Sequence, residues 1–302
     1  MKVAILIMSS DVEPSLRNIN AFKDTVVKYC ELNKDKLNHE YRFFVYRYGE
    51  DVLRFDDVYQ SLTNLVYQGK ESVYSTFEKT RRAFIDVREE YQPDVYVRVN
   101  ISTHINIPLF DTIVHKLDNN CLYCNRVNSF VNPTSKYFGY VYPRGDFMIM
   151  FDKHCLDIIN NGVKFEGING YSSGVDHVDD CIIGLCLYEA DSTYYRQLVQ
   201  LNYNYNPNSG IDDYYKYSIA TRLKSTPPNT NSGYSWDDNE YRLMDVDKFY
   251  QIQRLVESEI YEDVDYGDLL SSGGYPIMRY SALCVSIDEY DIYINAKNAG
   301  LV

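Results

Sequence analysis

The chain has 302 residues, 45% of them hydrophobic, which is enough to bury a substantial core without disulfides or structural metals. Its 43 acidic and 30 basic residues give a net charge of −13, which argues against a nucleic-acid partner because phosphate binding needs clustered cations. Seven cysteines, an odd number spread along the chain, favour reduced thiols and a cytoplasmic location over a disulfide framework.

The first segment, residues 2–8, is an apolar run that predicts a buried strand. It is far shorter than a membrane span and lacks a typical cleavage site, so we expect neither a transmembrane segment nor a signal peptide. A loop and a helix are predicted over residues 9–29, and a second strand over 41–46. The apolar face of that helix carries Ile19, Phe22, Val26 and Val27.

Helical and strand patterns alternate through the next part of the chain. Ser75 and Glu78 have capping-box spacing, and helical periodicity then continues up to Pro93. Residues 94–99 alternate like a strand and lead into a polar turn and a helix that begins near Pro108. This order is typical of a ligand site, because ligands of open α/β sheets bind beyond the carboxyl ends of strands.

A fourth predicted strand and two helices follow. Residues 147–151 predict an apolar strand, and Asp152 is predicted to cap a helix that Gly162 ends. The glycine- and serine-rich residues 167–174 lead into a helix that begins with the two acids at 179–180, where the helix dipole favours negative charge. Strands that alternate with helices in this way indicate an α/β fold.

Beyond about residue 200 the pattern weakens, and turn-rich segments surround one predicted helix at 245–260. No repeat or hinge-like linker divides the chain. Cys121 and Cys124 form a CxxC pair, but without a second pair a zinc or redox role is only weakly indicated. The 31 tyrosines suit sugar rings, since each offers an apolar face and a hydroxyl, and compositional bias explains the number equally well.

Residues 98–106 resemble the hallmark of the β1,3-galactosyltransferase and fringe-like glycosyltransferases, which reads roughly K-T-D-D-D-T-x-x-N after an apolar strand. The flanks of this motif match at Arg98, Thr103 and Asn106. Its three aspartates are replaced by Asn100, Ile101 and Ser102. An amide, an alkyl group and a hydroxyl are a poor set of ligands for Mg²⁺ or Mn²⁺.

The substituted triplet predicts sugar transfer that does not require a divalent metal, with cations screening the donor diphosphate instead. The candidate cations are Lys79, Arg98 and Arg144, and the resemblance adds Asn100 and Ser102 as donor-binding residues. The family also uses a late histidine as a metal ligand, whereas the last of the five histidines here is His177.

Two further segments resemble family motifs that bind the substrates. Residues 21–26 stand where the family has A-I-R-x-T-W, although an ordinary amphipathic helix and its cap explain this segment equally well. The motif implies donor contacts for Ser9, Ser10 and Arg17. The Tyr-Pro pair at 142–143 matches the start of another motif and implies acceptor contacts for Gly145, which allows close backbone approach, and Asp146.

The fourth segment resembles the family's E-D-V-x-x-G-x-C-L. It matches at Asp179, Asp180, Gly184, Cys186 and Leu187, with Asp for Glu at the first position and Cys181 in place of Val. The resemblance makes Asp180 the catalytic base and Asp179 a helix cap or hydroxyl ligand. Neighbouring helical residues point about 100° apart, so the two acids cannot form the facing pair of a glycosidase. The alternative is that both acids only stabilise the helix N-terminus.

Together these motifs imply a GT-A-like, Rossmann-related α/β fold with a mixed, mostly parallel central sheet flanked by helices and a loop-rich C-terminal part. Residues 1–200 would form the catalytic core, and 201–302 would complete the same domain, with Trp236 contacting the acceptor. The implied function is inverting transfer from a UDP-sugar to a saccharide hydroxyl. Retaining chemistry, and a non-catalytic carbohydrate-binding protein on the same scaffold, are the alternatives.

Overall fold

The computed structural model describes the residues that build a layered α/β fold. These residues are 1–9, 15–48, 59, 61–67, 76–125, 127–129, 140–165, 179–201, 203–206, 211, 215–216, 218–223, 225, 239–259, 261 and 278–279. Four features singled out in the sequence lie outside them, namely Ser10, Ser75, residues 167–174 and Trp236. Within the described part of the chain, no helix combines the length and apolar character that crossing a membrane requires.

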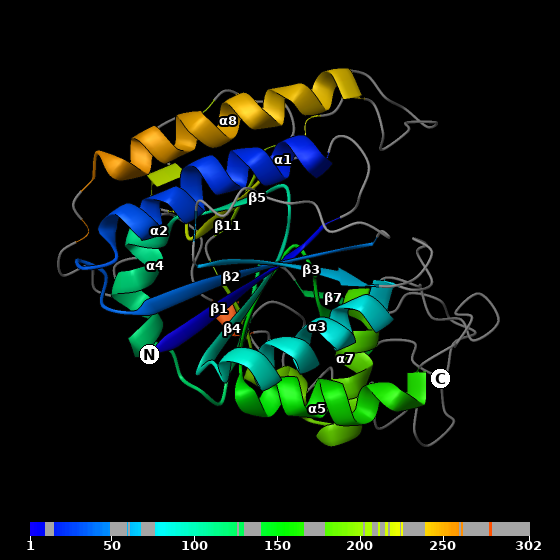
Figure 1. The fold of residues 1–302 in the computed structure, drawn as a ribbon. Coiled ribbons are helices and arrows are strands. Elements are labelled where there is room, and N and C mark those ends of the chain that lie inside the picture. The colour runs from blue at the N-terminus through cyan, green and yellow to red at the C-terminus, as the bar shows by residue number, and fades with distance from the viewer. Residues whose placement is uncertain are drawn as a thin grey trace.

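A mixed eight-stranded sheet forms the centre of the fold (Figure 1). From edge to edge it consists of β13 (Met278–Arg279), β10 (Leu198–Gln200), β6 (Leu122–Cys124), β9 (Phe147–Phe151), β4 (Val95–Asn100), β1 (Lys2–Met8), β2 (Glu40–Tyr48) and β3 (Leu62–Tyr67). Six strands share one direction, and β9 and β13 run antiparallel to their neighbours. The predicted mixed, mostly parallel sheet is therefore confirmed.

Helices cover both faces of this sheet, and each face has its own hydrophobic core (Figure 1). One layer contains α1 (Ser15–Phe22), the π-helical turn η1 (Lys23–Val27), α2 (Lys28–Asn33), α4 (Ile107–Ile113) and α8 (Asn239–Glu257). The other contains α3 (Thr76–Tyr91), α5 (Asp152–Gly162) and α7 (Asp179–Ala190). Because both faces are covered, β1 is buried from Val3 to Met8 without a polar alternation.

Short elements complete the structure. The 3-10 turns are η2 (Val114–Lys116), η3 (Val163–Phe165) and η4 (Tyr194–Gln197). A three-stranded sheet joins β11 (Tyr203–Asn206), β12 (Ala220–Leu223) and β5 (Thr103–Ile105), and a two-stranded sheet joins β7 (Val127–Ser129) and β8 (Val141–Pro143). The three-stranded sheet brings β12 from the weakly patterned part of the sequence beside the segment that follows β4.

The predicted elements are found, and several begin or end at other residues; α8, for example, begins at Asn239 rather than at 245. The first helix does not end near residue 29 but continues through the π-helical turn to Asn33. Asp152 does not cap α5, because its carboxylate instead accepts a hydrogen bond from Arg88 Nε at 2.8 Å. The backbone N–H of Phe151, just before the helix, donates to His154 Nδ1 at 3.2 Å. Both cysteines of the CxxC pair, Cys121 and Cys124, are buried and reduced, and the Cys121 thiol contacts Asp118 Oδ2 at 3.7 Å.

Candidate functional site

Polar residues meet at the carboxyl edge of the central sheet. Asn100 ends β4, and Asn125 follows β6, which runs in the same direction. Asp146 immediately precedes β9, which runs antiparallel to both strands, so its start lies at the same edge. The backbone confirms this alignment, because the amide of Asn100 donates to the carbonyl of Asp146 at 3.2 Å.

Helix α7 brings two carboxylates to this edge. The first, Asp179, forms an ion pair with Nη2 of Arg98 on β4, and both side chains are almost fully buried. The Thr80 hydroxyl on α3 donates to the same carboxylate oxygen at 2.8 Å. Arg98 also donates from Nη1 to the Asn100 amide oxygen at 3.1 Å. Asp179 therefore holds the start of α7 against both β4 and α3.

The second carboxylate, Asp180, has a different environment. Its two oxygens accept backbone hydrogen bonds from Gly145 N and Cys181 N, each at 3.0 Å. Burial, followed by the negative charge of Asp179, raises the pKa of Asp180 to about 6, against the opposing effect of those hydrogen bonds and of Arg98. Asp180 therefore changes its protonation state close to neutral pH, as a general base requires.

Gly145 is needed where β8 and β9 connect. A Cβ atom at this position would lie 2.7 Å from Nη1 of Arg98 and 3.2 Å from Cβ of Asp180. The backbone therefore approaches Arg98 and Asp180 closely here, and the predicted acceptor contact of Gly145 stays a prediction. The absent side chain lets the Gly145 amide reach the carboxylate of the candidate base.

Asp146 is the centre of a third set of contacts. Its carboxylate lies 3.2 Å from Nη1 of Arg222 on β12 and 3.7 Å from Nε of Arg144. The side-chain amides of Asn100 and Asn125 each donate to it at 3.3 Å. Burial alone would raise the pKa of Asp146, but the arginines, Arg222 most strongly, hold it below its ordinary value. Asp146 is thus an ionised, fully engaged carboxylate.

The charges of this cluster balance without a metal ion. Three carboxylates, those of Asp146, Asp179 and Asp180, stand against the three guanidinium groups of Arg98, Arg144 and Arg222. Among the described residues, no group of three or more His, Cys, Asp or Glu side chains is arranged to hold a metal. The predicted independence of a divalent metal stays a prediction.

The structure also places the remaining predicted donor residues. The ammonium of Lys79 donates to the Ser9 carbonyl at 2.6 Å and lies 4.3 Å from the centre of the Tyr48 ring, so it supports the end of β1. Ser102 is buried, and its carbonyl accepts a hydrogen bond from the Leu223 amide at 2.7 Å. Arg17 lies on the exposed side of α1. The donor-binding roles of these residues stay predictions.

Several residues of the cluster were not predicted. Arg222 lies in the region where the sequence pattern is weak, and Asn125 gave no signal beyond being a polar residue after a short strand. Thr80 lies within the helix predicted to end before Pro93, and no role of its own was predicted for it. Of the flanking motif residues, Thr103 donates to the Asp146 carbonyl at 3.2 Å, whereas Asn106 caps α4 by accepting from Leu109 N at 3.1 Å.

Two solved structures are similar to this chain at low sequence identity. One is a crystal structure of the galactosyltransferase LgtC in complex with donor and acceptor sugar analogues; it has 12% identity and a TM-score of 0.48, and the similarity covers 86% of this chain and 98% of that one. The other is an active-site mutant of LgtC with 13% identity and a TM-score of 0.46, covering 82% and 94%. No protein-family model and no curated protein sequence matches the chain. The chemistry of the site therefore has to be inferred from the chain's own residues.

Proposed function

We propose that this chain is an inverting glycosyltransferase that moves a sugar from a UDP-sugar to a hydroxyl of a saccharide acceptor. The observation that carries the proposal is the environment of Asp180. This carboxylate lies at the start of α7 on the carboxyl edge of the sheet, is held by the Gly145 amide, and has a pKa raised to about 6. A carboxylate of this kind suits proton removal at neutral pH.

In the proposed reaction one Asp180 oxygen accepts the proton of the acceptor hydroxyl. The acceptor oxygen attacks the anomeric carbon as that proton leaves, and the nucleoside diphosphate departs from the opposite face with the electrons of the broken bond. A single base is enough for this chemistry. Asp179 has a positioning role, because its Arg98 and Thr80 contacts fix the helix turn that carries Asp180.

The leaving diphosphate needs positive partners, and two are available in the cluster. Among the described residues, the Nε donors of Arg98 and Arg222 are buried and have no hydrogen-bond acceptor. A buried donor without a partner costs about 1–3 kcal/mol, so a side-chain shift that brings these donors to ligand acceptors would recover that energy. We propose that the diphosphate oxygens fill this role and that transfer does not depend on a divalent metal.

A non-catalytic saccharide-binding protein is the second candidate. It is favoured by one observation, namely that Asn100 and Ser102 replace acidic residues of the resembled motif and are themselves engaged or buried. The two candidates differ in one measurable product. A transferase releases UDP from a UDP-sugar in the presence of an acceptor, whereas a binding protein never does.

The test begins with a thermal-shift screen of UDP-sugars, since a specific donor stabilises the folded state. UDP release is then followed with the stabilising donor and a panel of saccharide acceptors. We expect Asp180→Asn to lower kcat by about 10²-fold or more while donor binding is retained, because general-base catalysis contributes 10²–10⁴-fold. Asp35→Asn, at an exposed position, is the matched control.

The pH profile and the product give independent readouts. Because the ionised form of Asp180 is the active base, kcat/KM should rise with pH around an apparent pKa of about 6 and then level off. Activity should survive exhaustive treatment with EDTA, and NMR should show inversion at the anomeric carbon. Unchanged turnover in Asp180→Asn would refute the assignment of the base, and loss of activity that only Mn²⁺ restores would refute metal independence.

A further inference from the structure

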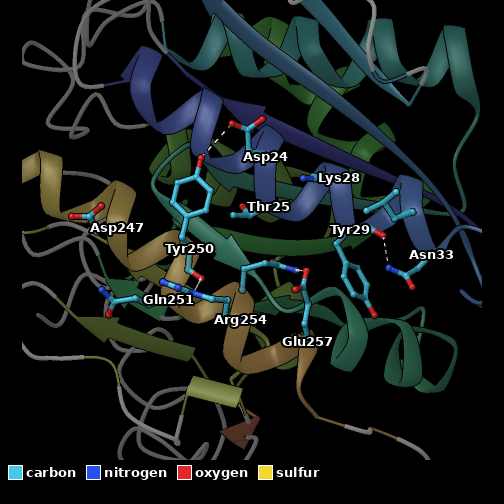
Figure 2. A pocket seen from close by; sticks show the side chains of 12 residues that line it. Asp24, Thr25, Lys28, Tyr29, Asn33, Asp247, Tyr250, Gln251, Arg254 and Glu257 are labelled. Carbon is cyan, nitrogen blue, oxygen red and sulfur yellow. Dashed lines mark hydrogen bonds between the residues drawn. The ribbon is translucent and has the colours of Figure 1, made fainter.

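A groove lies on the face of the sheet opposite α7, between α8 and the continuous helix formed by α1, η1 and α2 (Figure 2). Its volume is about 690 Å³. It is lined by Asp24, Thr25, Lys28, Tyr29, Leu32, Asn33, Asp247, Tyr250, Gln251, Gln253, Arg254 and Glu257. None of these residues belongs to the cluster around Asp180, so the groove is separate from the proposed catalytic site.

Two tyrosine rings flank the groove from its two walls (Figure 2). Tyr250 on α8 is 36% exposed, and its hydroxyl donates to the Asp24 carboxylate at 3.3 Å, which holds the ring across the groove. Tyr29 stands on α2, where its carbonyl accepts from the Asn33 amide at 3.0 Å. The Tyr250 ring is fixed by its hydroxyl, and the Tyr29 ring lines the groove from the other wall. Tyrosine rings offer apolar faces to a ligand, and sugar rings present C–H faces that can stack on them.

The charge of the lining restricts the ligand. Three carboxylates, from Asp24, Asp247 and Glu257, exceed the two cations Lys28 and Arg254. Burial raises the pKa of the Tyr29 hydroxyl, and nearby acids including Glu257 add to the rise, as expected of a site with negative potential. A polyanion is therefore disfavoured in this groove.

Apolar partners are disfavoured as well. Leu32 is the one large aliphatic side chain in the lining, and the other groups are amides, carboxylates, cations, hydroxyls and the two rings. Amides can donate to and accept from hydroxyl groups, and ionised carboxylates accept hydrogen bonds from them. Such a lining suits a neutral ligand that combines many hydroxyls with flat C–H faces.

A second hollow of about 640 Å³ shares Tyr29 and Asn33 with this groove and is otherwise lined by different residues, Pro108 and Tyr261 among them. We name the first hollow, between α2 and α8, the α2–α8 groove.

We propose that the α2–α8 groove binds a neutral oligosaccharide, at a site separate from Asp180. The tyrosine rings stack on sugar units, and the carboxylates and amides of both walls bind their hydroxyls. Oligosaccharide binding in this groove does not depend on sugar transfer, because no residue of the groove takes part in the proposed reaction.

The test is titration of the full chain by calorimetry with hexasaccharides of the cello, malto and chito series. We expect saturable binding of at least one hexamer, tighter than the corresponding disaccharide. Tyr250→Ala should weaken it about tenfold through loss of the ring, and Tyr250→Phe should retain it within about twofold. Leu243→Ala is the matched control, because Leu243 is exposed on the same helix but lies outside the groove.

The location is checked by amide hydrogen exchange. Bound hexasaccharide should slow exchange in residues 28–33 and 247–257, which form the two walls of the groove. The proposal is overturned by the absence of binding for all three hexamers, or by unchanged binding in Tyr250→Ala. Equal weakening in Leu243→Ala, or tighter binding of a sulfated hexasaccharide than of the neutral ones, would also overturn it.

Discussion

Helices α7 and α8 cover opposite faces of the central sheet, and they are attached by different kinds of contact. At the first turn of α7 the Asp179 carboxylate is paired with the Arg98 guanidinium, and neither group is accessible to water. α8 is attached through apolar packing, with the rings of Phe249 and Phe22 meeting edge to face at a centroid distance of 6.2 Å.

One polar contact beneath α8 is neutral, whereas Asp245 and Lys248 of the same helix contact Ser225. His104 on β5 is fully buried, and its Nε2 lies 2.9 Å from Oε1 of Gln253. Because the amide nitrogen of Gln253 donates to Glu257 at 2.8 Å, its oxygen accepts, which assigns the proton to Nε2 of His104. Burial lowers the pKa of His104 to about 4, so the imidazole is uncharged at neutral pH.

The two kinds of contact have different consequences for the helices that they hold. A buried ion pair costs desolvation energy and adds little net stability, but it sets the position of α7 and therefore of the neighbouring Asp180. α8 is held by apolar packing and by the neutral His104–Gln253 hydrogen bond, together with the buried Asp245 carboxylate, which accepts from the Ser225 amide at 2.9 Å. Its outer side lines the α2–α8 groove.

The largest expected effect is at the charged attachment. Asp179→Ala leaves the Arg98 guanidinium buried without its partner, and we expect the free energy of unfolding to fall by about 3–5 kcal/mol. Urea denaturation followed by circular dichroism measures this. Asp35→Ala, on the exposed surface, is the control and should change stability by less than about 0.5 kcal/mol.

The neutral attachment gives the comparison. Gln253→Ala removes the hydrogen-bond partner of an uncharged group, so its expected cost is smaller, about 1–3 kcal/mol. If Gln253→Ala destabilised the protein as strongly as Asp179→Ala, the contrast between the two helices would be broken.

The next effect concerns the geometry around Asp180. Gly145→Ala introduces a Cβ that would lie 2.7 Å from Arg98 Nη1, so the guanidinium or the loop has to shift. We expect a loss of about 1–3 kcal/mol in stability, as in other overpacked sites. Turnover should fall by a larger factor than donor affinity, because the shift displaces the amide that holds the Asp180 carboxylate. Full activity in Gly145→Ala would show that the function of Asp180 does not depend on the close approach at Gly145.

The smallest effect is a dependence of stability on pH at the neutral attachment. His104 has a folded-state pKa of about 4 and an unfolded value near 6.5, so the unfolded chain binds more protons between these values. The contribution of His104 to the free energy of unfolding is therefore complete above the unfolded pKa, and it is lost as the pH falls toward the folded pKa. Between pH 7 and pH 5.5 the protonation of His104 in the unfolded chain lowers the free energy of unfolding by about 1 kcal/mol.

This dependence can be assigned to His104 with one variant. His104→Gln should make the fall in the urea midpoint between pH 7 and pH 5.5 shallower, because glutamine does not titrate. His154, whose pKa burial lowers to about 3, contributes in the same direction and remains in both proteins. An identical pH profile in the variant would mean that His104 does not contribute.

The sequence predicted those elements whose signal is local. Each of these signals lies in one short segment: the apolar run of β1, the helical period of α3 and the acidic start of α7. A local pattern exists because the burial of one face, or of a whole element, determines which positions are apolar. The order of strands and helices was therefore enough for the fold class. The acids at 179–180 were also found by position, since they open a helix after a loop.

The tertiary structure decided what these residues do to one another. Arg98 and Asp179 are 81 positions apart, and Thr80 and Asp179 are 99 apart, so no local pattern could pair them. The different environments of Asp179 and Asp180, one ion-paired and one held by backbone amides, depend on which strands and loops surround the start of α7. Electrostatic energy follows distance and burial in the folded protein, and the sequence determines neither without the packing of distant segments.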